Sequence, residues 1–387
     1  MLRLDRRLLH NVDWPLLGAA FAIVVLSVIC LSSLGLGRGG SGLALRQLLW
    51  VGVGIGALLV VVTFDYRSFV RAAPALYLVG LGLLVTVFVL GRMVSGARRW
   101  IHFGPLTFQP SELFKLIFIL TLAWALTWRR EAQPSSRATL GGTFALVAVP
   151  FVLVVRQPDL GTALVLLPVL AAVLVGVGVR LRILGGLAGA GIALMPIAWF
   201  FLKPYQRDRL LVYLDPFRDP LGTAYNVIQA KIAIGSGQLL GKGISGATQS
   251  RLAFLPERHT DFIFAVFAEM WGFVGCLVLI VAYGVLVLRG FEIAVVTREA
   301  RGRIIALGVT ALFAAQTLIN LGMVTGLLPV VGIPLPLIQR QLGHSHLSTT
   351  EKYIRVAEEL RPGFGEVFPD LPKSVLRGVV ALPRSAA

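Results

Sequence analysis

Residues 254–265 read Phe254-Leu-Pro-Glu-Arg-His-Thr-Asp261-Phe-Ile-Phe-Ala265, so a segment dense in charge runs directly into an apolar one. The apolar run continues to Leu288, which gives 27 residues after Asp261. A helix needs about 20 apolar residues to cross a bilayer, so this run predicts a membrane span. A carboxylate at the edge of a span costs free energy unless it has a partner or a function. We therefore expect Asp261 at the mouth of the membrane, where an enzyme acting on a lipid-linked substrate would need a base.

Further apolar runs of similar length show that the whole chain has the composition of a membrane protein. Hydrophobic residues make up 56% of the 387 residues, and the mean hydropathy is +0.82. The apolar runs lie at 14–34, 47–64, 74–91, 111–128, 139–155, 160–178, 183–202, 261–288 and 304–328. Runs of this length satisfy their backbone groups in lipid as helices. We therefore expect an all-α fold, a polytopic transmembrane helix bundle with nine spans.

The chain begins with a basic segment and a first apolar run that resemble a signal peptide. The apolar run Trp14–Leu34 is too long for one and has no small-residue cleavage site after it, so an uncleaved first span is expected. Cys30 and Cys276 fall inside apolar runs, which favours packing roles over a disulfide. The five histidines lack the spacing of metal ligands, so no metal site is predicted.

The distribution of Lys and Arg among the short loops predicts the orientation of the spans. With the N-terminus inside, the cytoplasmic segments hold 14 basic residues and the short outer loops hold 6. The large loop 203–260, between spans seven and eight, is then extracytoplasmic and carries eight more basic residues. Topology and this loop account for the net charge of +17 without nucleic acid as a partner.

Alternation of the spans places four polar segments on the outer side of the membrane. They are the loop 92–112, the segment Arg156-Gln-Pro-Asp159-Leu-Gly-Thr, the loop 203–260 that ends at Asp261, and the chain after Pro329. We expect these segments to build one extracytoplasmic cavity.

Three charged residues at the starts of spans have a structural and a functional interpretation each. Glu112 and Lys115 lie three apart on one helix face, so they can form an ion pair, which either locks helices together or contacts substrate. Asp159 follows Pro158 and precedes an apolar run, so it is either a helix cap or a functional acid.

Basic residues of the outer loops are candidates for holding an anion. Arg98 and Arg99 are either solvated loop charges or paired guanidiniums for a diphosphate. The long loop offers further candidate substrate-binding residues, namely Lys231, Lys242, Arg258 and His259. Within it, Tyr225–Ile234 has the pattern of a helix in the interface plane, which could dock a headgroup or serve as a lid. The glycine-rich run 235–243 lacks the spacing of a phosphate loop.

Position alone leaves Asp261 with two interpretations. As the residue that opens a helix, it could be an N-terminal cap. Alternatively, Glu257, Arg258 and His259 beside it could tune its pKa for acid–base chemistry at the membrane boundary.

Several segments together resemble the SEDS family (shape, elongation, division and sporulation) of polytopic glycosyltransferases, and its rod-shape branch more than its division branch. The resemblance covers residues 1 to about 337. It is carried by Arg98-Arg-Trp-Ile, Phe108-Gln-Pro-Ser-Glu-Leu-Phe-Lys115, Gln157-Pro-Asp-Leu-Gly-Thr162, Tyr225-Asn-Val-Ile-Gln-Ala-Lys-Ile-Ala-Ile-Gly-Ser-Gly237, Leu255-Pro-Glu-Arg-His-Thr-Asp-Phe-Ile-Phe264 with Glu269-Met-Trp-Gly, and Gly326-Leu-Leu-Pro-Val-Val-Gly-Ile-Pro-Leu-Pro336.

The resemblance implies polymerisation of peptidoglycan glycan strands from lipid II on the outer face of the bacterial cytoplasmic membrane, with release of undecaprenyl diphosphate. Asp261 matches the family's essential aspartate, so it is expected to act as general base in an inverting single displacement. Glu112, Lys115 and Asp159 match family motif positions near that site. A class B penicillin-binding protein and the elongation machinery are the implied partners. A divalent cation is possible, although the cofactor is unknown.

After Pro336 the chain departs from the family pattern, which would continue into a serine- and glycine-rich loop and a tenth span. Residues 338–356 instead resemble the last motif of tyrosine recombinases, through Leu342-Gly-His344, Thr349-Thr350 and Tyr353. The rest of a recombinase site has no counterpart, so Tyr353 is not expected to act on DNA. We divide the chain into a glycosyltransferase domain, 1–337, and a polar tail, 338–387, from a fused or misassembled gene end. Impaired activity is expected.

A second hypothesis is a transporter such as a lipid II flippase. Glu112, Lys115 and Asp159 near the membrane could line a pathway. No inverted repeat is evident in the span pattern, and the charges gather on one side rather than at the midplane. The glycosyltransferase is therefore preferred.

Overall fold

The computed structural model describes residues 12–35, 41–94, 97–103, 106–128, 136–201, 225–247 and 259–329, together with 207, 210, 211, 213 and 215. The chain divides into two units, Met1–Leu335 and Pro336–Ala387. All described residues belong to the first unit. The predictions about the tail 338–387 therefore lie outside the described residues.

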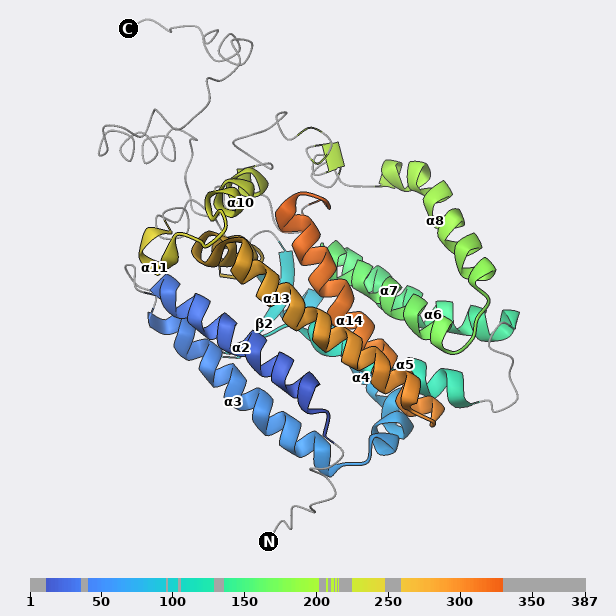
Figure 1. Cartoon of the computed structure of the whole chain (residues 1–387). Helices are drawn as coiled ribbons and strands as arrows, with labels where there is room; N and C mark the ends of the chain where they lie inside the picture. Colours follow the sequence, from blue (N-terminus) through green and yellow to red (C-terminus); the bar gives the residue numbers. More distant parts are fainter. Residues whose placement is uncertain are drawn as a thin grey trace, which may run out of the picture. The chain divides into compact units, whose positions relative to one another are not determined.

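Long apolar helices coincide with all nine runs predicted from hydropathy (Figure 1). They are α2 (Trp14–Gly35), α3 (Ser41–Thr63), α4 (Tyr66–Leu90), α5 (Pro110–Trp128), α6 (Arg137–Arg156), α7 (Leu160–Gly176), α8 (Leu181–Phe201), α13 (Ile263–Val296) and α14 (Ala300–Thr325). Within the described part of the chain, seven helices are long and apolar enough to cross a membrane. The other two, α7 and Leu181–Leu194 of α8, are shorter apolar helices. The predicted helix bundle is confirmed, and nine as the number of spans stays a prediction.

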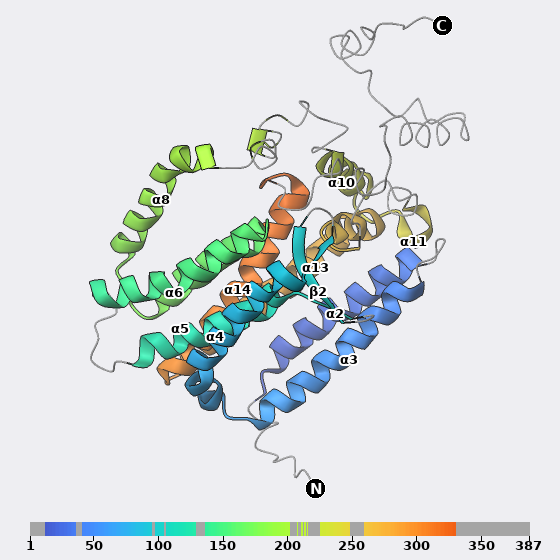
Figure 2. The same ribbon diagram turned by 180° about the vertical axis from the view of Figure 1, so that it is seen from behind.

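The core lies where α14 packs against α13, α5 and α7, with α4 against α5 (Figures 1 and 2). Its largest cluster includes Phe114, Phe118 and Leu122 of α5, all 1% exposed or less. Small residues bring the helices together, as is usual in membrane bundles. A Cβ on Gly80 of α4 would lie 2.8 Å from the Phe114 ring, and one on Gly308 of α14 would lie 2.6 Å from Ile119. Cys30 and Cys276 are free and buried, which agrees with the predicted packing roles.

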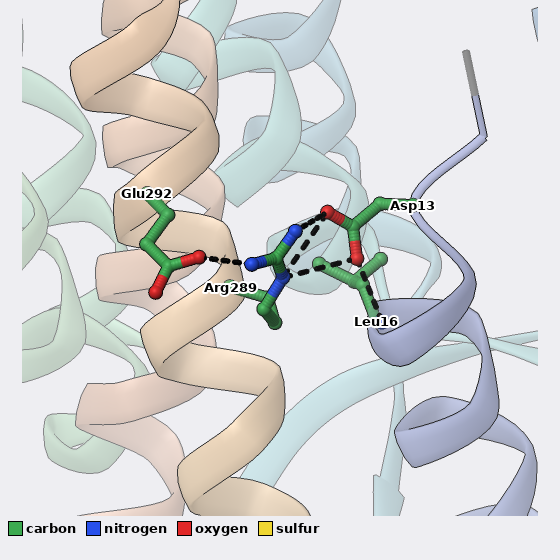
Figure 3. Close-up of polar contacts among 4 residues, drawn as sticks. All are labelled: Asp13, Leu16, Arg289 and Glu292. Carbon is green, nitrogen blue, oxygen red and sulfur yellow. Dashed lines mark hydrogen bonds and ion pairs between the residues drawn. The ribbon is translucent and has the colours of Figure 1, made fainter.

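An ionic cluster joins the first helix to α13 at the ends that the charge rule places inside the cell. Arg289 of α13 binds Asp13 through a contact of 2.6 Å and also pairs with Glu292 (Figure 3). Asp13 additionally accepts the backbone N–H of Leu16 at 2.9 Å, so it caps α2. The hydrogen bond from Arg289, followed by the one from Leu16, lowers the pKa of the Asp13 carboxyl.

A second cluster at the same end joins α4 to the turn before α14. Tyr66 and Arg67 donate to Glu299 at 2.6 Å and 2.7 Å. These hydrogen bonds, that from Tyr66 first, lower the pKa of Glu299. Because the two clusters involve α2, α4, α13 and the start of α14, they fix the ends of four helices relative to each other.

At the opposite end, the loop between α4 and α5 contains three short antiparallel strands. They are β1 (Arg92–Val94), β2 (Ala97–Phe103) and β3 (Leu106–Phe108), in the order β1-β2-β3. Met93 pairs with Arg98, and Ile101 pairs with Phe108. Strand β2 contacts α4 and α5, so this small sheet lies on the helix ends. These strands were not predicted from the sequence.

The helix predicted at Tyr225–Ile234 is present as α10 (Tyr225–Ser236), docked on the bundle, and its place in the membrane interface stays a prediction. Its buried face, Asn226, Ala230 and Ala233, packs against α13 and α14. The short helix α11 (Gly243–Gly246) follows and contacts α13. The glycine-rich run between them is thus a helix end and a turn against α13, which agrees with its rejection as a phosphate loop.

Helix α13 is interrupted at Gly272, where φ is 63° and ψ is −161°. The turn after α10 fills this break. The N–H of Phe273 donates to the carbonyl of Gln238 at 2.8 Å, and the N–H of Val274 donates to that of Leu239 at 3.1 Å. A break in a membrane helix leaves backbone groups that need new partners. The α10–α11 segment supplies them, and it is thereby fixed beside the start of α13.

Candidate active site

Asp261 lies in a turn two residues before α13, and it is half-buried. The helix begins at Ile263 with Phe262 at the N-cap position, and this cap has no side-chain hydrogen bond. Asp261 is therefore not the N-cap residue, in contrast to one of the two interpretations that its sequence position allowed. Its backbone carbonyl accepts a hydrogen bond of 3.0 Å from the side-chain amide of Asn320 in α14.

The residue after Asp261 anchors this turn in an apolar cluster. Phe262 is 2% exposed and packs with residues of three helices. The cluster comprises Ala230, Ala233, Phe262, Ala265, Met323 and Val324. Since α10 and α14 both contribute to it, the position of Asp261 depends on the docking of α10 as well as on α13.

A cavity of about 360 Å³ lies beside this turn, between α2, α13 and α14. Thr260, next to Asp261, lines it together with Gln316, Thr317 and Asn320 of α14. Its other lining residues are mainly apolar, among them Phe264 and Phe267. The residues that line it do not include Glu112, Lys115 or Asp159. The prediction of one cavity shared by all four polar segments stays a prediction.

Asp159 and Arg99 join the sheet to α7. Asp159 is the N-cap of α7 and accepts the backbone N–H of Thr162 at 3.2 Å, so the predicted cap is confirmed. It also lies 3.7 Å from Arg99 of β2 and accepts a hydrogen bond from Gln109 at 3.0 Å. Arg99 donates to the carbonyl of Pro158 as well, and its buried Nε has no hydrogen-bond partner among the described residues. Arg99 is thus held as part of the structure, in an ion pair largely removed from solvent.

Glu112 and Lys115 form the predicted ion pair on the first turns of α5, at 2.8 Å. The Lys115 side chain is 3% exposed and that of Glu112 is 52% exposed. An ammonium buried in this way requires a paired charge. The pair therefore lets a lysine enter the bundle, while the exposed carboxylate remains accessible.

Lys242 pairs with a buried carboxylate that the sequence analysis did not select as a site residue. Its Nζ lies 3.7 Å from Glu269 of α13, whose side chain is fully buried. The backbone N–H of Lys242 also donates to the carbonyl of Glu269 at 2.9 Å. Glu269 could have been selected because it is a glutamate inside an apolar span. Burying a carboxylate there costs free energy unless it has a partner or a function.

The side chain of Lys231, a residue of α10, lies beside the C-terminal end of α14. A Cβ on Gly326, the C-cap of that helix, would lie 2.4 Å from Cε of Lys231. The side chain is exposed, and an ammonium near the carbonyl end of a helix is electrostatically favoured. The Lys231 side chain therefore reaches from α10 to the end of α14 and keeps its charge near solvent.

The remaining predicted site residues are only partly described. His259 is exposed in the turn that contains Asp261. Arg98 lies on β2, while its side chain and the whole of Arg258 are outside the described residues. Across the described ranges, no three histidine, cysteine, aspartate or glutamate side chains are grouped to hold a metal ion.

Apolar helices with ion pairs near their ends, and with Asp261 in a turn beside an apolar cavity, define a polytopic α-helical membrane protein with a polar site at the helix ends. The FtsW/RodA/SpoVE family, described as "Cell cycle protein", matches residues 9–350. The chain belongs to this family, which is the one that its sequence resembles.

Relatives and solved structures agree with this membership. Peptidoglycan glycosyltransferase MrdB of Escherichia coli is 42% identical over 298 residues, which cover 77% of this chain and 80% of that protein. Probable peptidoglycan glycosyltransferase FtsW of Geobacter metallireducens is 35% identical over 297 residues, or 76% of this chain and 78% of that one.

Two solved structures share the fold. A chain from a peptidoglycan synthase complex, studied for its coordination of polymerization and crosslinking, matches with a TM-score of 0.71 and 35% identity, over 84% of this chain and 91% of that one. The rod shape determining protein RodA of Thermus thermophilus matches with a TM-score of 0.61 and 31% identity, over 84% and 89%. A solved structure of an aspartate-to-alanine variant of the same RodA also matches, with a TM-score of 0.61 and 30% identity.

Proposed function

We propose that this chain is a peptidoglycan glycosyltransferase of the rod-shape branch, which polymerises lipid II in the cytoplasmic membrane. The observation that carries the proposal is the 42% identity to E. coli MrdB over 80% of its length. The identity to an FtsW relative is lower, at 35%, which favours the rod-shape role over the division role. The reaction would take place on the outer face, where the charge rule puts Asp261.

Asp261 is the proposed general base. Its carboxylate would take the proton of the acceptor sugar's 4-hydroxyl while that oxygen attacks the anomeric carbon of the donor chain. The bond from the anomeric carbon to the diphosphate breaks, and its electron pair leaves with undecaprenyl diphosphate. Attack opposite an α-linked diphosphate gives a β-1,4 bond, so a single displacement inverts the configuration. A half-buried carboxylate in a turn at the start of a membrane helix suits a proton acceptor for a substrate held in the membrane.

The basic candidates divide by how far their side chains are exposed. Arg99 and Lys115 are largely buried in ion pairs within the protein, so their proposed role is to position β2 and α5. Lys231 is exposed, and Lys242 is 35% exposed while it pairs with Glu269, so both are accessible to a diphosphate. A cation placed where negative charge develops stabilises the leaving group. Arg98, Arg258 and His259 remain further candidates for this role.

The proposed partners follow from the same assignment. A peptidoglycan synthase complex that couples polymerization to crosslinking contains a chain with this fold. Crosslinking is the work of a transpeptidase, so a class B penicillin-binding protein and the elongation machinery are the proposed partners. Lipid II and undecaprenyl-linked glycan are the proposed membrane-bound substrate and products.

The test is polymerisation of lipid II by the purified full-length chain in liposomes, compared with its Asp261→Ala variant. Loss of a general base lowers rates by roughly 10²–10⁴-fold, and we expect polymer formation to fall by that factor. Glu292→Gln, at the opposite end of α13, is the matched control and should keep its activity. Lipid II translocation is measured in parallel. Lost translocation with intact polymerisation would instead support a flippase.

The atypical tail gives the proposal a second test. Residues 338–387 stand where the family pattern has a loop that would line the cavity and a tenth span, so we expect weak activity from the chain as it is. Replacing them with a family-type C-terminus should raise polymer formation and the melting temperature. Equal activity of both proteins would contradict the predicted impairment.

A further inference from the structure

Asn320 is an amide side chain near the end of α14, a helix otherwise apolar enough to cross a membrane. It is partly buried, and its Nδ2 donates to the backbone carbonyl of Asp261 at 3.0 Å. Polar side chains between packed membrane helices form hydrogen bonds that fix one helix relative to another. This bond links α14 to the turn rather than to another helix, so it acts directly on the residue proposed as the base.

Two contacts restrain the turn on either side of the peptide bond after Asp261. Phe262 fixes its C-terminal side in the apolar cluster with Ala265 and Met323, and Asn320 binds the carbonyl that precedes Phe262. The apolar contact acts on a side chain, whereas the Asn320 bond acts on the peptide group itself. The amide of Asn320 restrains that peptide group, and therefore the direction of the bond from Cα to Cβ of Asp261.

We infer that Asn320 is a positioning residue for Asp261, which holds the carboxylate in the orientation needed for proton abstraction. This inference rests on the proposed role of Asp261 as general base. A base must lie within hydrogen-bond reach of the proton that it takes, and a displacement of about 1 Å can cost roughly 100-fold in rate. Groups that act in this way need support from residues that are themselves fixed by packing.

The chain provides a matched control on the same helix. Thr310 is a buried polar residue of α14 and is not among the residues that line the cavity between α2, α13 and α14. Thr310→Val and Asn320→Leu each replace a polar side chain of α14 by an apolar one. A difference between the two variants therefore reports the bond to Asp261 rather than the loss of any polar group from this helix.

The first measurement is the kinetics of lipid II polymerisation by the full chain in liposomes. We expect Asn320→Leu to lower kcat by roughly 10- to 100-fold with KM within about twofold, since the bond orients the base and does not contact the substrate. Thr310→Val should keep kcat within about threefold on the same scale. Asn320→Asp should lose activity as pH rises, because an ionised carboxylate cannot donate to the carbonyl. Equal kcat values for Asn320→Leu and Thr310→Val would overturn the inference.

The second measurement is amide hydrogen exchange, which does not depend on activity. Without the Asn320 bond, exchange in the peptide that covers residues 259–265 should become roughly five- to tenfold faster, while Thr310→Val leaves it unchanged. Unchanged exchange in Asn320→Leu overturns the positioning role even if the enzyme is inactive. Full polymerisation by Asp261→Ala overturns the proposed base instead, so the two failures are distinguishable.

Discussion

The backbone N–H of Phe273 donates to the carbonyl of Gln238 across 2.8 Å, so the break in α13 is closed by the turn that follows α10. The same turn is fixed a second time by the N–H of Lys242, which donates to the carbonyl of Glu269 at 2.9 Å. The long loop before Asp261 is thus bonded to the helix after it. The conformation of the candidate site depends on this junction as much as on the apolar contacts below it.

Gly272→Ala tests the junction. A Cβ at this position would lie 2.3 Å from the backbone nitrogen of Gly241, and the φ of 63° disfavours any side chain. We expect the variant to lose roughly 2–4 kcal/mol of unfolding free energy, from the strained backbone and the displaced turn together. Thermal unfolding in detergent, followed by circular dichroism, measures the loss.

Gly284→Ala is the control for that experiment. Gly284 lies in the same helix, and a Cβ there would have open space around it. Alanine is the better helix former, so this variant should be as stable as the parent or slightly more so. If Gly272→Ala unfolds at the same temperature as Gly284→Ala, the close backbone approach at the junction does not contribute to stability.

Local sequence rules predicted the parts of the fold that depend on neighbours in the chain. Helices had to form over the nine apolar runs because lipid offers no other partner for backbone groups. Asp159 could be predicted as a cap because an acid before an apolar helix usually is one. Glu112 and Lys115 could be paired from their spacing of three along a helix.

These rules could not predict pairs between residues that lie far apart in the sequence. Arg99 was considered only as a solvated charge or a diphosphate ligand, and its pairing with Asp159 requires knowing that β2 lies against the start of α7. Lys242 with Glu269 and Asn320 with Asp261 likewise follow from how α10 and α14 pack on α13. A polar residue inside an apolar run indicates that a partner is needed, but hydropathy does not identify which residue that partner is.

Substitutions of Asp159 separate its two roles. Asp159→Asn keeps an oxygen that can cap α7 but removes the charge opposite Arg99, whose side chain is 15% exposed. We expect a loss of roughly 1–3 kcal/mol, because the guanidinium remains largely buried without its counter-ion. Asp159→Ala removes the cap as well and should cost about 1 kcal/mol more. Unfolding free energies of the two variants measure both terms.

Ser136→Ala is the control for the cap alone. Ser136 accepts the N–H of Thr139 at the start of α6, at 3.2 Å, as an uncharged cap. Its loss should cost about 1 kcal/mol. The charge opposite Arg99 has no structural role if Asp159→Asn proves as stable as the parent protein.

A double-mutant cycle tests the pair of Lys242 and Glu269. Lys242→Met should destabilise the protein by roughly 1–2 kcal/mol, since it removes a counter-ion from a buried carboxylate, and the 35% exposure of Lys242 limits the effect. Glu269→Gln combined with Lys242→Met should cost less than the sum of the single changes, with a coupling of about 1 kcal/mol. Lys242→Arg retains the charge and serves as control. Strictly additive losses would show that the two side chains do not interact.

Acid sensitivity is expected from Asp13, which connects the start of α2 to Arg289 (Figure 3). The hydrogen bond from Arg289 lowers the pKa of this carboxyl below its ordinary value of 3.8. A lowered folded-state pKa means that the stabilisation is complete above the unfolded-state pKa and disappears as pH falls through the folded-state pKa. The melting temperature should therefore drop as the pH is lowered from about 5 towards 2.

Asp13→Asn isolates this contribution. An asparagine can still accept the N–H of Leu16 and cap α2, so the variant loses the charge and keeps the cap. It should melt below the parent at neutral pH, and the difference should shrink as the parent's carboxyl is protonated. Because Asp13 and Arg289 lie near solvent, 1 M salt should reduce the difference at neutral pH. Parallel pH profiles for both proteins would show that Arg289 does not stabilise the ionised form of Asp13.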